Sequence, residues 1–473
     1  MLFKSDRVAT LIVALLVGAC ATQPVGQQSS GIAVAPAWNA VQNSTLVTTS
    51  DQVDQQWWTH FSDPVLDGLI AEALANNRTL MIARERINEA RADRVIARSA
   101  LFPNVQADAT TSRGNQGYLT GNRALNVAQA DIQASWELDL FGRNQALTAR
   151  AAAILQSVEA ASQAVRVTLL ADVARNYFDL RDYEMQLALT RENLALQQKT
   201  YELTNTQFQA GYSSEYDVQL AAAQVSATSA AIPPLQADFD AALNALNLLL
   251  GEPPGTVDAR LKTPPALQPL DARVLIAAPA RVLETRPDIR VAERQFAASI
   301  SGRKAAVAQL YPDISLTGLF GVQGATGFGG TPWSIGSTLA QPILNFGRIE
   351  AQIDVADAQQ KENFLNYQQV VLAALQDMEN ALSNYQHESL HYSTLTASVE
   401  HSQRAADLAQ QQYTGGAFSL LDLLIIQRDL LAAEEARADS DVALRKDLVS
   451  IYTAAGGGWH DADTSTGPVA SSH

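Results

Sequence analysis

The chain has 473 residues, and 49 Asp+Glu against 33 Lys+Arg give it a net charge of −16. This acidic balance argues against a nucleic-acid partner, because binding to phosphates needs a basic surface. The single cysteine excludes both a disulfide framework and a thiolate metal site.

The N-terminus combines charged, apolar and small residues in a fixed order. Lys4 and Arg7 precede an apolar run at 8–17, and small residues then lead to Cys20. This order is typical of a secretory signal, so we predict a signal peptide at 1–19. Cys20 directly after the small residues resembles a bacterial lipobox, which implies acylation of Cys20. The alternative is a plain signal peptide with an incidental cysteine. No run of about 18 apolar residues follows, so a crossing of the membrane must use strands.

An internal repeat of about 205 residues organises the rest of the chain. Phe141-Gly142-Arg143 recurs as Phe346-Gly347-Arg348, and Leu101-Phe102-Pro103-Asn104 recurs as Leu310-Tyr311-Pro312-Asp313. Each repeat reads as helix, strand pair, long helix, turn and helix. The predicted layout is a lipidated N-terminal segment and equatorial region at 20–64, a first repeat at 65–251, a Pro-rich equatorial linker at 252–280, a second repeat at 281–455 and a C-terminal tail at 456–473.

The strands are predicted from alternation. Apolar and polar residues alternate from 128 to 140, which indicates a strand with one apolar and one polar face. At about 3.3 Å per residue it would be roughly 43 Å long, which suits a membrane-crossing strand better than a half-buried strand of a soluble sandwich. Partner strands are expected near 103–113, 312–322 and 332–343. On the polar face Asp131, Glu137 and Asp139 would line a lumen and favour cations.

Four strands cannot close a barrel, for which about eight is the practical minimum. An open sheet edge in lipid would leave backbone groups without partners, at a cost of several kcal/mol each. We therefore predict that copies of the chain share one barrel.

The long helices are predicted at 144–210 and 349–415, where neither proline nor internal glycine occurs. Apolar residues recur there at steps of seven, which is typical of a coiled coil. The second run has Val371, Met378, Tyr385, Tyr392, Val399, Ala406 and Tyr413, and the first has Val173, Leu180, Leu187, Leu194, Tyr201 and Phe208. Shorter helices at 65–100 and 216–250 are expected to stack end to end, with a junction near residues 65 and 250.

The string HESLH at 387–391 has the spelling of a zinc metalloprotease helix. In the heptad frame it lies on the flank of a long rod, and the equivalent positions of the first repeat, 182–186, read DYEMQ. We interpret it as a coincidence on a solvated helix face. The sequence predicts no metal site, no cofactor and no enzymatic activity.

Taken together, these residues resemble the TolC/OprM outer-membrane efflux channels, specifically the lipoprotein branch that includes OprM and NodT. The marks are Trp57-Trp58-x-x-Phe61-x-Asp63-Pro64-x-Leu66, Phe102-Pro103, Trp136-Glu137-Leu138-Asp139-Leu140-Phe141-Gly142-Arg143, Arg286-Pro287-Asp288-Ile289, Tyr311-Pro312-x-Ile314-Ser315-Leu316 and Gly456-Gly457-Gly458-Trp459. The resemblance implies a mostly α-helical chain with a transmembrane β part. Three chains would form a twelve-stranded β-barrel, with four strands each, continued by a long periplasmic α-helical coiled-coil barrel.

The resemblance also implies partners. The homotrimer would be the passive exit duct of a tripartite pump, anchored to lipid in the outer membrane and extending into the periplasm. A periplasmic adaptor and an inner-membrane pump, expected to be proton-driven, would open it. An exit channel for type I protein secretion is the alternative within the same fold, and a structural coiled-coil lipoprotein or tether is the alternative from another class.

The candidate gate lies where each long helix turns. Gly211 and Gly416 permit the left-handed conformation that ends a helix, and Ser213 or Ser419 is a candidate cap for the next helix. The resemblance implies that these tips close the periplasmic aperture. The candidate gate residues are Asp217, Asp422, Phe418, Leu421 and Tyr216. Some relatives have charged residues where Ile425 and Gln412 stand here, so we expect packing of Phe418 and Leu421 to matter more. Helix N-terminal acids that complement the dipole are the alternative for Asp217 and Asp422.

Overall fold

The computed structural model describes residues 29–41, 47–50, 53–114, 124–261, 267–268, 270, 274–325 and 328–459. Cys20, the predicted signal peptide and most of the tail lie outside the described residues. The chain forms two compact units. The sheet unit includes Ile96–Ile154 and Glu293–Gln368, and the hairpin unit includes Ala33–Val95, Leu155–Ala292 and the chain after residue 368.

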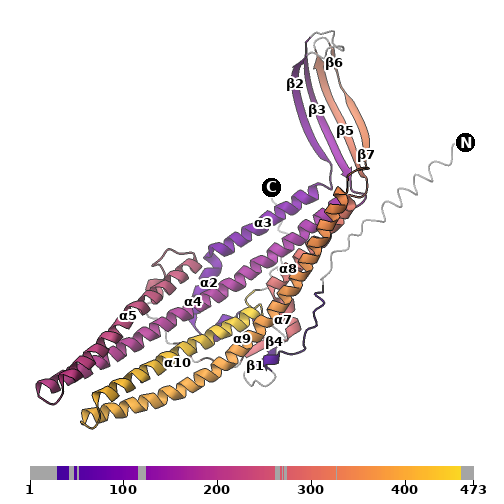
Figure 1. Ribbon diagram of the computed structural model, residues 1–473. Coiled ribbons are helices and arrows are strands. Elements are labelled where there is room, and N and C mark those ends of the chain that lie inside the picture. The colour runs from indigo at the N-terminus through magenta and orange to yellow at the C-terminus, as the bar shows by residue number, and fades with distance from the viewer. Residues whose placement is uncertain are drawn as a thin grey trace. The chain divides into compact units, whose positions relative to one another are not determined.

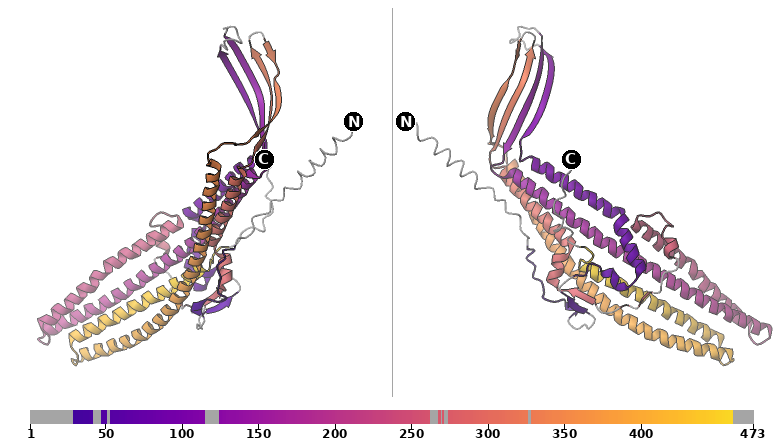
Figure 2. Two further views of the ribbon diagram at one scale, coloured as in Figure 1. Left: turned by 45° about the vertical axis from the view of Figure 1, so that its right-hand side comes forward. Right: turned by 180° about the vertical axis from the view of Figure 1, so that it is seen from behind.

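The sheet unit is an antiparallel sheet in the order β2 (Asn104–Gly114), β3 (Leu125–Leu138), β5 (Asp313–Ala325) and β7 (Trp333–Ala340). The short strand β6 (Phe328–Gly330) also pairs with β5, beyond the end of β7. Figures 1 and 2 show the long strands side by side. The prediction of four strands in two pairs is confirmed, and the two pairs join where β3 meets β5.

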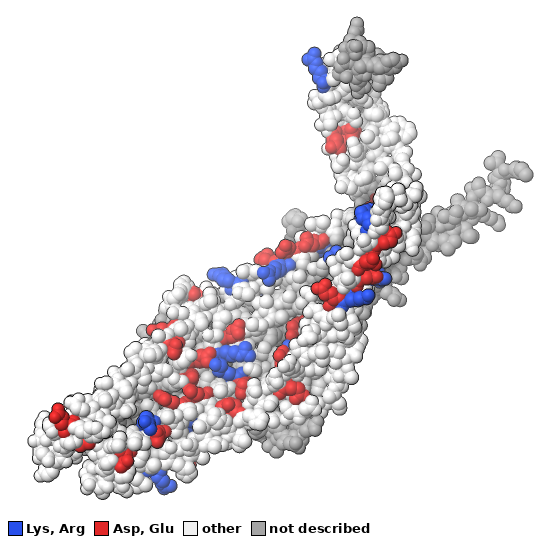
Figure 3. All heavy atoms as spheres, viewed as in Figure 1, with Lys and Arg blue, Asp and Glu red and all other residues white. Residues whose placement is uncertain are grey.

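Asp131 is the centre of a small hydrogen-bonded group on the polar face of β3. Asp131 accepts hydrogen bonds from the side-chain amides of Gln129 (2.7 Å) and Gln133 (2.8 Å), one residue on either side along the same face. Opposite it, Gly321 leaves room, because a Cβ there would approach the Cβ of Asp131 to 2.6 Å. The face of the strands that Figure 3 shows carries few charged groups, as expected of strands that meet lipid.

One detail of this strand was predicted wrongly. β3 ends at Leu138, two residues early, and Asp139 does not lie on its polar face. Instead, the carboxylate of Asp139 accepts hydrogen bonds from the backbone N–H groups of Asn144 (3.1 Å) and Gln145 (2.7 Å). These groups belong to the first turn of the next helix, where N–H groups lack intrahelical partners, so the capping interaction outweighs the strand alternation.

The long helices are α4 (Arg143–Gln209) and α9 (Arg348–Thr414), each of 67 residues. Both begin at the arginine of the repeated Phe-Gly-Arg motif, so the predicted bounds hold to within one residue. Helices α5 (Glu215–Leu250) and α10 (Leu420–Ala454) return from them and complete two helical hairpins, seen in Figure 1. No helix among the described residues is long and apolar enough to cross a membrane.

The predicted helix at 65–100 is two helices, α2 (Pro64–Asn76) and α3 (Arg78–Ser99). Asn77 breaks the run: its side chain accepts a hydrogen bond from the N–H of Leu80 (2.9 Å) and donates one to the carbonyl of Leu249 (2.8 Å). The end of α5 at Gly251 packs against the Asn76 carbonyl, which a Cβ would approach to 2.5 Å. The junction therefore lies at 76–77 and 250, and the prediction near residue 65 is wrong.

The remaining elements of the described chain are η1 (Asn39–Val41), β1 (Val47–Ser50), η2 (Trp57–Phe61), α6 (Asp258–Leu261), β4 (Val274–Ala277), α7 (Pro279–Thr285) and α8 (Pro287–Ala308). Strands β1 and β4 pair in parallel.

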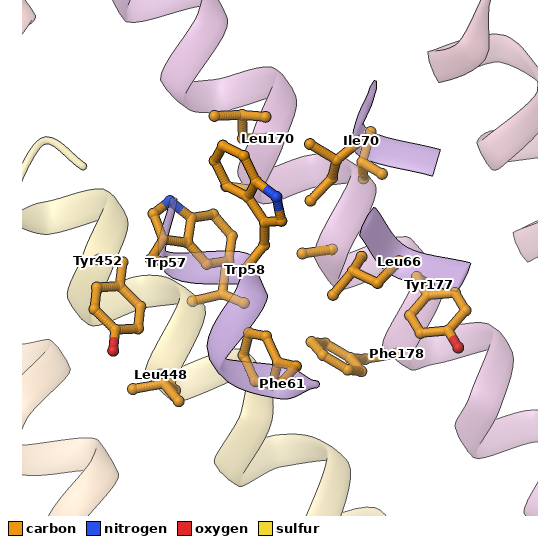
Figure 4. Close-up of a cluster of buried hydrophobic side chains, with 14 of the residues drawn as sticks. Trp57, Trp58, Phe61, Leu66, Ile70, Leu170, Tyr177, Phe178, Leu448 and Tyr452 are labelled. Carbon is orange, nitrogen blue, oxygen red and sulfur yellow. The ribbon is translucent and has the colours of Figure 1, made fainter. Parts of the chain in front are cut away.

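The core of the hairpin unit is aromatic. Trp57 stacks on Tyr452 (centroids 5.7 Å apart, interplanar angle 11°), and Phe61 meets Phe178 edge-on at 4.8 Å. Figure 4 shows these rings converging from η2, α4 and α10. We call Trp57, Trp58, Phe61, Tyr177 and Phe178 the aromatic core; all are buried.

Asp63 links this core to a helix start. Its carboxylate accepts hydrogen bonds from Tyr177 Oη (2.6 Å) and from the N–H groups of Val65 and Leu66 at the start of α2. Pro64 occupies the first turn, where a missing N–H costs nothing. The Trp-Trp-x-x-Phe-x-Asp-Pro mark is thus a packing and capping motif.

Candidate gate at the hairpin tips

The two tip turns have the same backbone geometry. Gly211 (φ +81°) and Gly416 (φ +73°) are both left-handed. The N–H of Gly211 donates to the carbonyl of Phe208 (2.9 Å), and that of Tyr212 to the carbonyl of Gln207 (2.8 Å). Gly416 and Ala417 repeat this pair of bonds at 3.0 and 2.9 Å. This is the Schellman arrangement, in which glycine accepts a conformation that a Cβ would strain.

Serine and aspartate start the returning helices. The Ser214 hydroxyl accepts from the Asp217 N–H (3.2 Å), and the Asp217 carboxylate accepts from the Ser214 N–H (3.1 Å), which completes a capping box. The cap of α5 is therefore Ser214, and the suggestion of Ser213 is wrong. Ser419 caps α10, where its hydroxyl accepts from the N–H of Asp422 (3.2 Å).

The acids of the candidate gate are thus engaged in capping. Hydrogen bonds from Ser214, together with one from Ser213, hold the pKa of Asp217 below its usual value. The Asp422 carboxylate accepts from the Ser419 hydroxyl at 2.6 Å. Both carboxylates lie at helix N-termini, where negative charge is favourable.

The apolar members of the candidate gate separate into two kinds. Phe418 is half-buried against a small tip core of Ala221, Ala409, Tyr413, Leu420, Leu423 and Leu424. Tyr216 and Leu421, at equivalent positions of the two repeats, are exposed by 67% and 47%. Only Tyr216 and Leu421 are therefore available to meet another surface, while Phe418 joins the two hairpins at the tip.

The distal half of α4 differs from its prediction. Past Leu187 the buried positions are polar: Thr190, Asn193, Gln197, Thr200 and Thr204, which we call the polar seam. The expected apolar series is wrong there, because Phe208 is 41% exposed and Leu194 and Tyr201 are only half-buried. In α9 the apolar prediction holds, and of its series only Tyr392 is not fully buried. The spacing of three and four residues among the polar side chains was a signal that could have revealed the polar seam.

The polar seam faces the other hairpin. Thr204 Oγ1 lies 3.0 Å from Tyr413 Oη on α9, and Thr190 hydrogen bonds to Glu435 on α10. Within α4 the Gln197 amide donates to Asn193 Oδ1 at 2.5 Å. The side-chain oxygens of Gln197 and Gln427 are buried and have no hydrogen-bond partner among the described residues.

A carboxylate pair lies next to the polar seam, between α4 and α10. Gln186 donates to both Asp182 (3.1 Å) and Asp439 (2.6 Å). Burial, and then the charge of Asp439, raises the pKa of Asp182 to about 6. Lys446 binds Asp179 at 2.5 Å beside this pair and lowers the pKa of Asp182 only in part.

The HESLH string serves helix packing. Glu388 hydrogen bonds to Ser440 on α10, while His387 and His391 are exposed. His391 Nδ1 lies 3.3 Å from Glu388 Oε1. Among the described residues no three His, Cys, Asp or Glu side chains are placed to hold a metal ion.

Comparisons with known proteins agree with this architecture. The family model described as outer membrane efflux protein matches residues 69–252 and 278–457. Nodulation protein T of Rhizobium leguminosarum bv. viciae is 31% identical over 460 residues, covering 96% of this chain and 94% of that protein. The pyoverdine export outer membrane protein OpmQ of Pseudomonas aeruginosa is 31% identical over 464 residues, covering 94% and 95%. The solved structure of the outer-membrane channel OprN superposes with a TM-score of 0.84 at 32% identity, covering 92% of this chain and 99% of that one.

Proposed function

This chain belongs to the outer membrane efflux protein family, and from that premise we propose that three copies of it build one closed tube. The chain is the outer-membrane channel of an efflux pump and extends into the periplasm; the alternative of a structural tether is wrong. In the proposed trimer the four strands of each copy contribute to one twelve-stranded barrel.

One observation carries the proposed trimer. Among the described residues, the long edge strands β2 and β7 each pair with a neighbour on one side only. Unpaired N–H and C=O groups facing lipid cost several kcal/mol each. Pairing β7 with β2 of the next copy removes both edges, and three copies with two pseudo-equivalent halves each give the helical part quasi-sixfold packing.

The test is to count chains and measure conduction. Native mass spectrometry of detergent-solubilised protein should give particles of three chains, and these should form channels in planar bilayers. Particles of a single chain, or trimers that never conduct, would contradict the proposal.

We further propose that the cargo is a small toxic compound and that a periplasmic adaptor with a proton-driven inner-membrane pump delivers it. The name of the relative OpmQ, a pyoverdine export protein, supports a small-molecule cargo. Deletion of the gene in its host should lower resistance to drugs, solvents or metals. A secretome that loses one protein, with unchanged resistance, would favour type I secretion instead.

Cys20 is the proposed lipid anchor. Labelled palmitate should be incorporated into the full chain and lost in Cys20→Ser, which keeps the size and shape of the residue. Equal labelling of both chains would contradict acylation at Cys20.

The gate is proposed at the tips, with Tyr216 and Leu421 facing the aperture and Asp217 and Asp422 just behind them. The geometry of the caps decides how the acids must be tested. Asp422→Asn keeps a hydrogen-bond acceptor for capping but removes the charge, whereas Asp422→Ala removes both. If a ring of charge sets conductance, both variants should change single-channel conductance and antibiotic leak.

Capping alone predicts a different outcome for the same pair of variants. Only Asp422→Ala should then loosen the tip, by about 1 kcal/mol, with conductance of the asparagine variant unchanged. Asp217→Asn and Asp217→Ala apply the same test to the first repeat.

A further inference from the structure

We propose that Phe346 of one copy packs against Phe102 of the neighbouring copy, as an aromatic contact at the base of the strands where two copies meet. This contact rests on the proposed trimer. In the proposed trimer the backbones of β7 and β2 pair between two copies, and this contact adds an interaction between side chains.

The template for the contact is present once within each chain. Where the first repeat meets the second, at the β3–β5 pair, Phe141 follows β3 and Tyr311 precedes β5. Their rings are stacked with centroids 4.7 Å apart and an interplanar angle of 9°. Offset stacks of this kind are favourable for aromatic side chains.

The repeat places the counterparts of these two rings at the free edges. Phe346 occupies in Phe346-Gly347-Arg348 the place that Phe141 has in Phe141-Gly142-Arg143, and it follows the edge strand β7. Phe102 occupies in Leu101-Phe102-Pro103 the place that Tyr311 has in Leu310-Tyr311-Pro312, and it precedes the edge strand β2. The same junction can form a second time only between two copies.

Exposure agrees with a contact that lies outside the single chain. Phe346 is 91% exposed, and Phe102 is 56% exposed with the Arg98 guanidinium 5.9 Å from its ring centroid. Ile343 and Leu344, before Phe346, are 93% and 75% exposed. Such a group of large apolar side chains on one short segment indicates an interaction surface.

The backbone of Phe346 is a second, independent sign. Its φ of +52° is left-handed, one of two such values among the described non-glycine residues. A bulky side chain adopts this conformation rarely, because its Cβ crowds the backbone. The neighbouring Gly347 donates its N–H to Asn345 Oδ1 (3.0 Å), which shapes the turn that holds the ring outward. The strained backbone is retained although the ring of Phe346 makes few contacts within its own chain. This indicates that the ring has a function.

The two junctions differ in charge. Within the chain Arg143 lies 3.9 Å from Asp313, beside the Phe141–Tyr311 stack. Between copies the equivalent pair is Arg348 and Asn104, which cannot form an ion pair. The contact between copies is therefore mainly apolar, and salt should affect it little.

Cross-linking tests the contact directly, and the chain has only one native cysteine, Cys20. The double variant Phe102→Cys/Phe346→Cys, treated with a short methanethiosulfonate cross-linker, should give covalent trimers on a denaturing gel. Each single variant should stay at the size of one chain. The matched control is Phe141→Cys/Tyr311→Cys, which should link within a chain and leave its size unchanged.

The outcomes separate the contact from the proposed trimer. Three-chain particles by native mass spectrometry that yield no covalent trimers would overturn the contact and leave the trimer standing. Single-chain particles would overturn both. A fluorophore at Phe346→Cys that brominated lipid quenches in the trimer would assign Phe346 to lipid and also overturn the contact.

A second measurement does not depend on cysteine chemistry. Phe346→Ala and Phe102→Ala should each lower the temperature at which the trimer dissociates in detergent, and the double variant should lower it no further than the stronger single. Additive shifts would indicate that the two rings do not touch. Phe141→Ala, which removes the ring of the junction within the chain, is the control for general loss of packing.

Discussion

Helix α4 passes through two very different environments within one uninterrupted run. From Leu169 to Leu180 it packs in the aromatic core, with Tyr177 and Phe178 fully buried. From Thr190 to Thr204 the same helix buries threonine and amide side chains against the other hairpin. Separating apolar surfaces loses about 25 cal/mol per Å², whereas hydrogen bonds in a polar seam can be exchanged for bonds to water at little net cost. Helix α4 is therefore held firmly along the aromatic core and loosely along the polar seam.

This contrast gives a physical basis for opening at the tip. Two hairpins that join through an apolar seam would resist parting along their whole length. With the polar seam next to the turns, parting exposes groups that water satisfies, including the side-chain oxygen of Gln197, which lacks a partner among the described residues. The small apolar tip core then remains as the main contact that keeps the hairpins together.

The largest effect is expected in the aromatic core. Trp57→Ala removes a fully buried ring stacked on Tyr452 and should cost about 4 kcal/mol of stability. Thermal unfolding followed by circular dichroism measures it. Tyr212→Ala, which removes an aromatic ring that is 87% exposed at the tip, is the control and should change stability by less than about 0.5 kcal/mol. Equal losses of stability in Trp57→Ala and Tyr212→Ala would contradict the conclusion that the aromatic core holds α4 firmly.

The polar seam should respond in the opposite direction. Asn193→Ala/Gln197→Leu replaces a hydrogen-bonded pair by apolar groups of similar total volume and should stabilise the protein by about 1.5 kcal/mol. Because the hairpins would then part less readily, open probability in planar bilayers should fall. Gln198→Leu, at an exposed position of the same helix, is the control. A stable variant that opens as often as the unchanged protein would refute a role of the polar seam in opening.

A smaller effect is expected from pH. The pKa of Asp182 is about 6 in the folded chain and lower in the unfolded chain, so the folded state binds the extra proton between about pH 4 and 6. This contribution is therefore most favourable at low pH and is lost as pH rises through 6. Since Asp182 is only half-buried, we expect about 1 kcal/mol between pH 5 and pH 7.

Asp182→Asn should abolish that part of the pH dependence and raise stability at pH 7, as measured by thermal midpoints across the range. Asp439 and Asp179 face the same carboxylate, and Lys446 offsets them in part. An asparagine variant with the same pH dependence as the unchanged chain would assign the effect elsewhere, first to Asp447, whose pKa burial and Glu388 also raise to about 6.

By itself, the sequence determined the repeat, the two long helices and the strand pairs. These features are local: a run without proline or glycine stays helical, and strict alternation favours a strand wherever the chain lies. Tertiary structure alone decided that Asn77 divides a helix, that Asp139 caps a helix and leaves the strand face, and that α4 buries threonines rather than Leu194 and Phe208 past Leu187. Each of these outcomes depends on which part of the chain packs against the residue. A long helix has several faces that could be buried, and only its tertiary contacts select one of them. The same reason explains why Phe346, identical in motif to Phe141, is left without the ring that Phe141 has beside it.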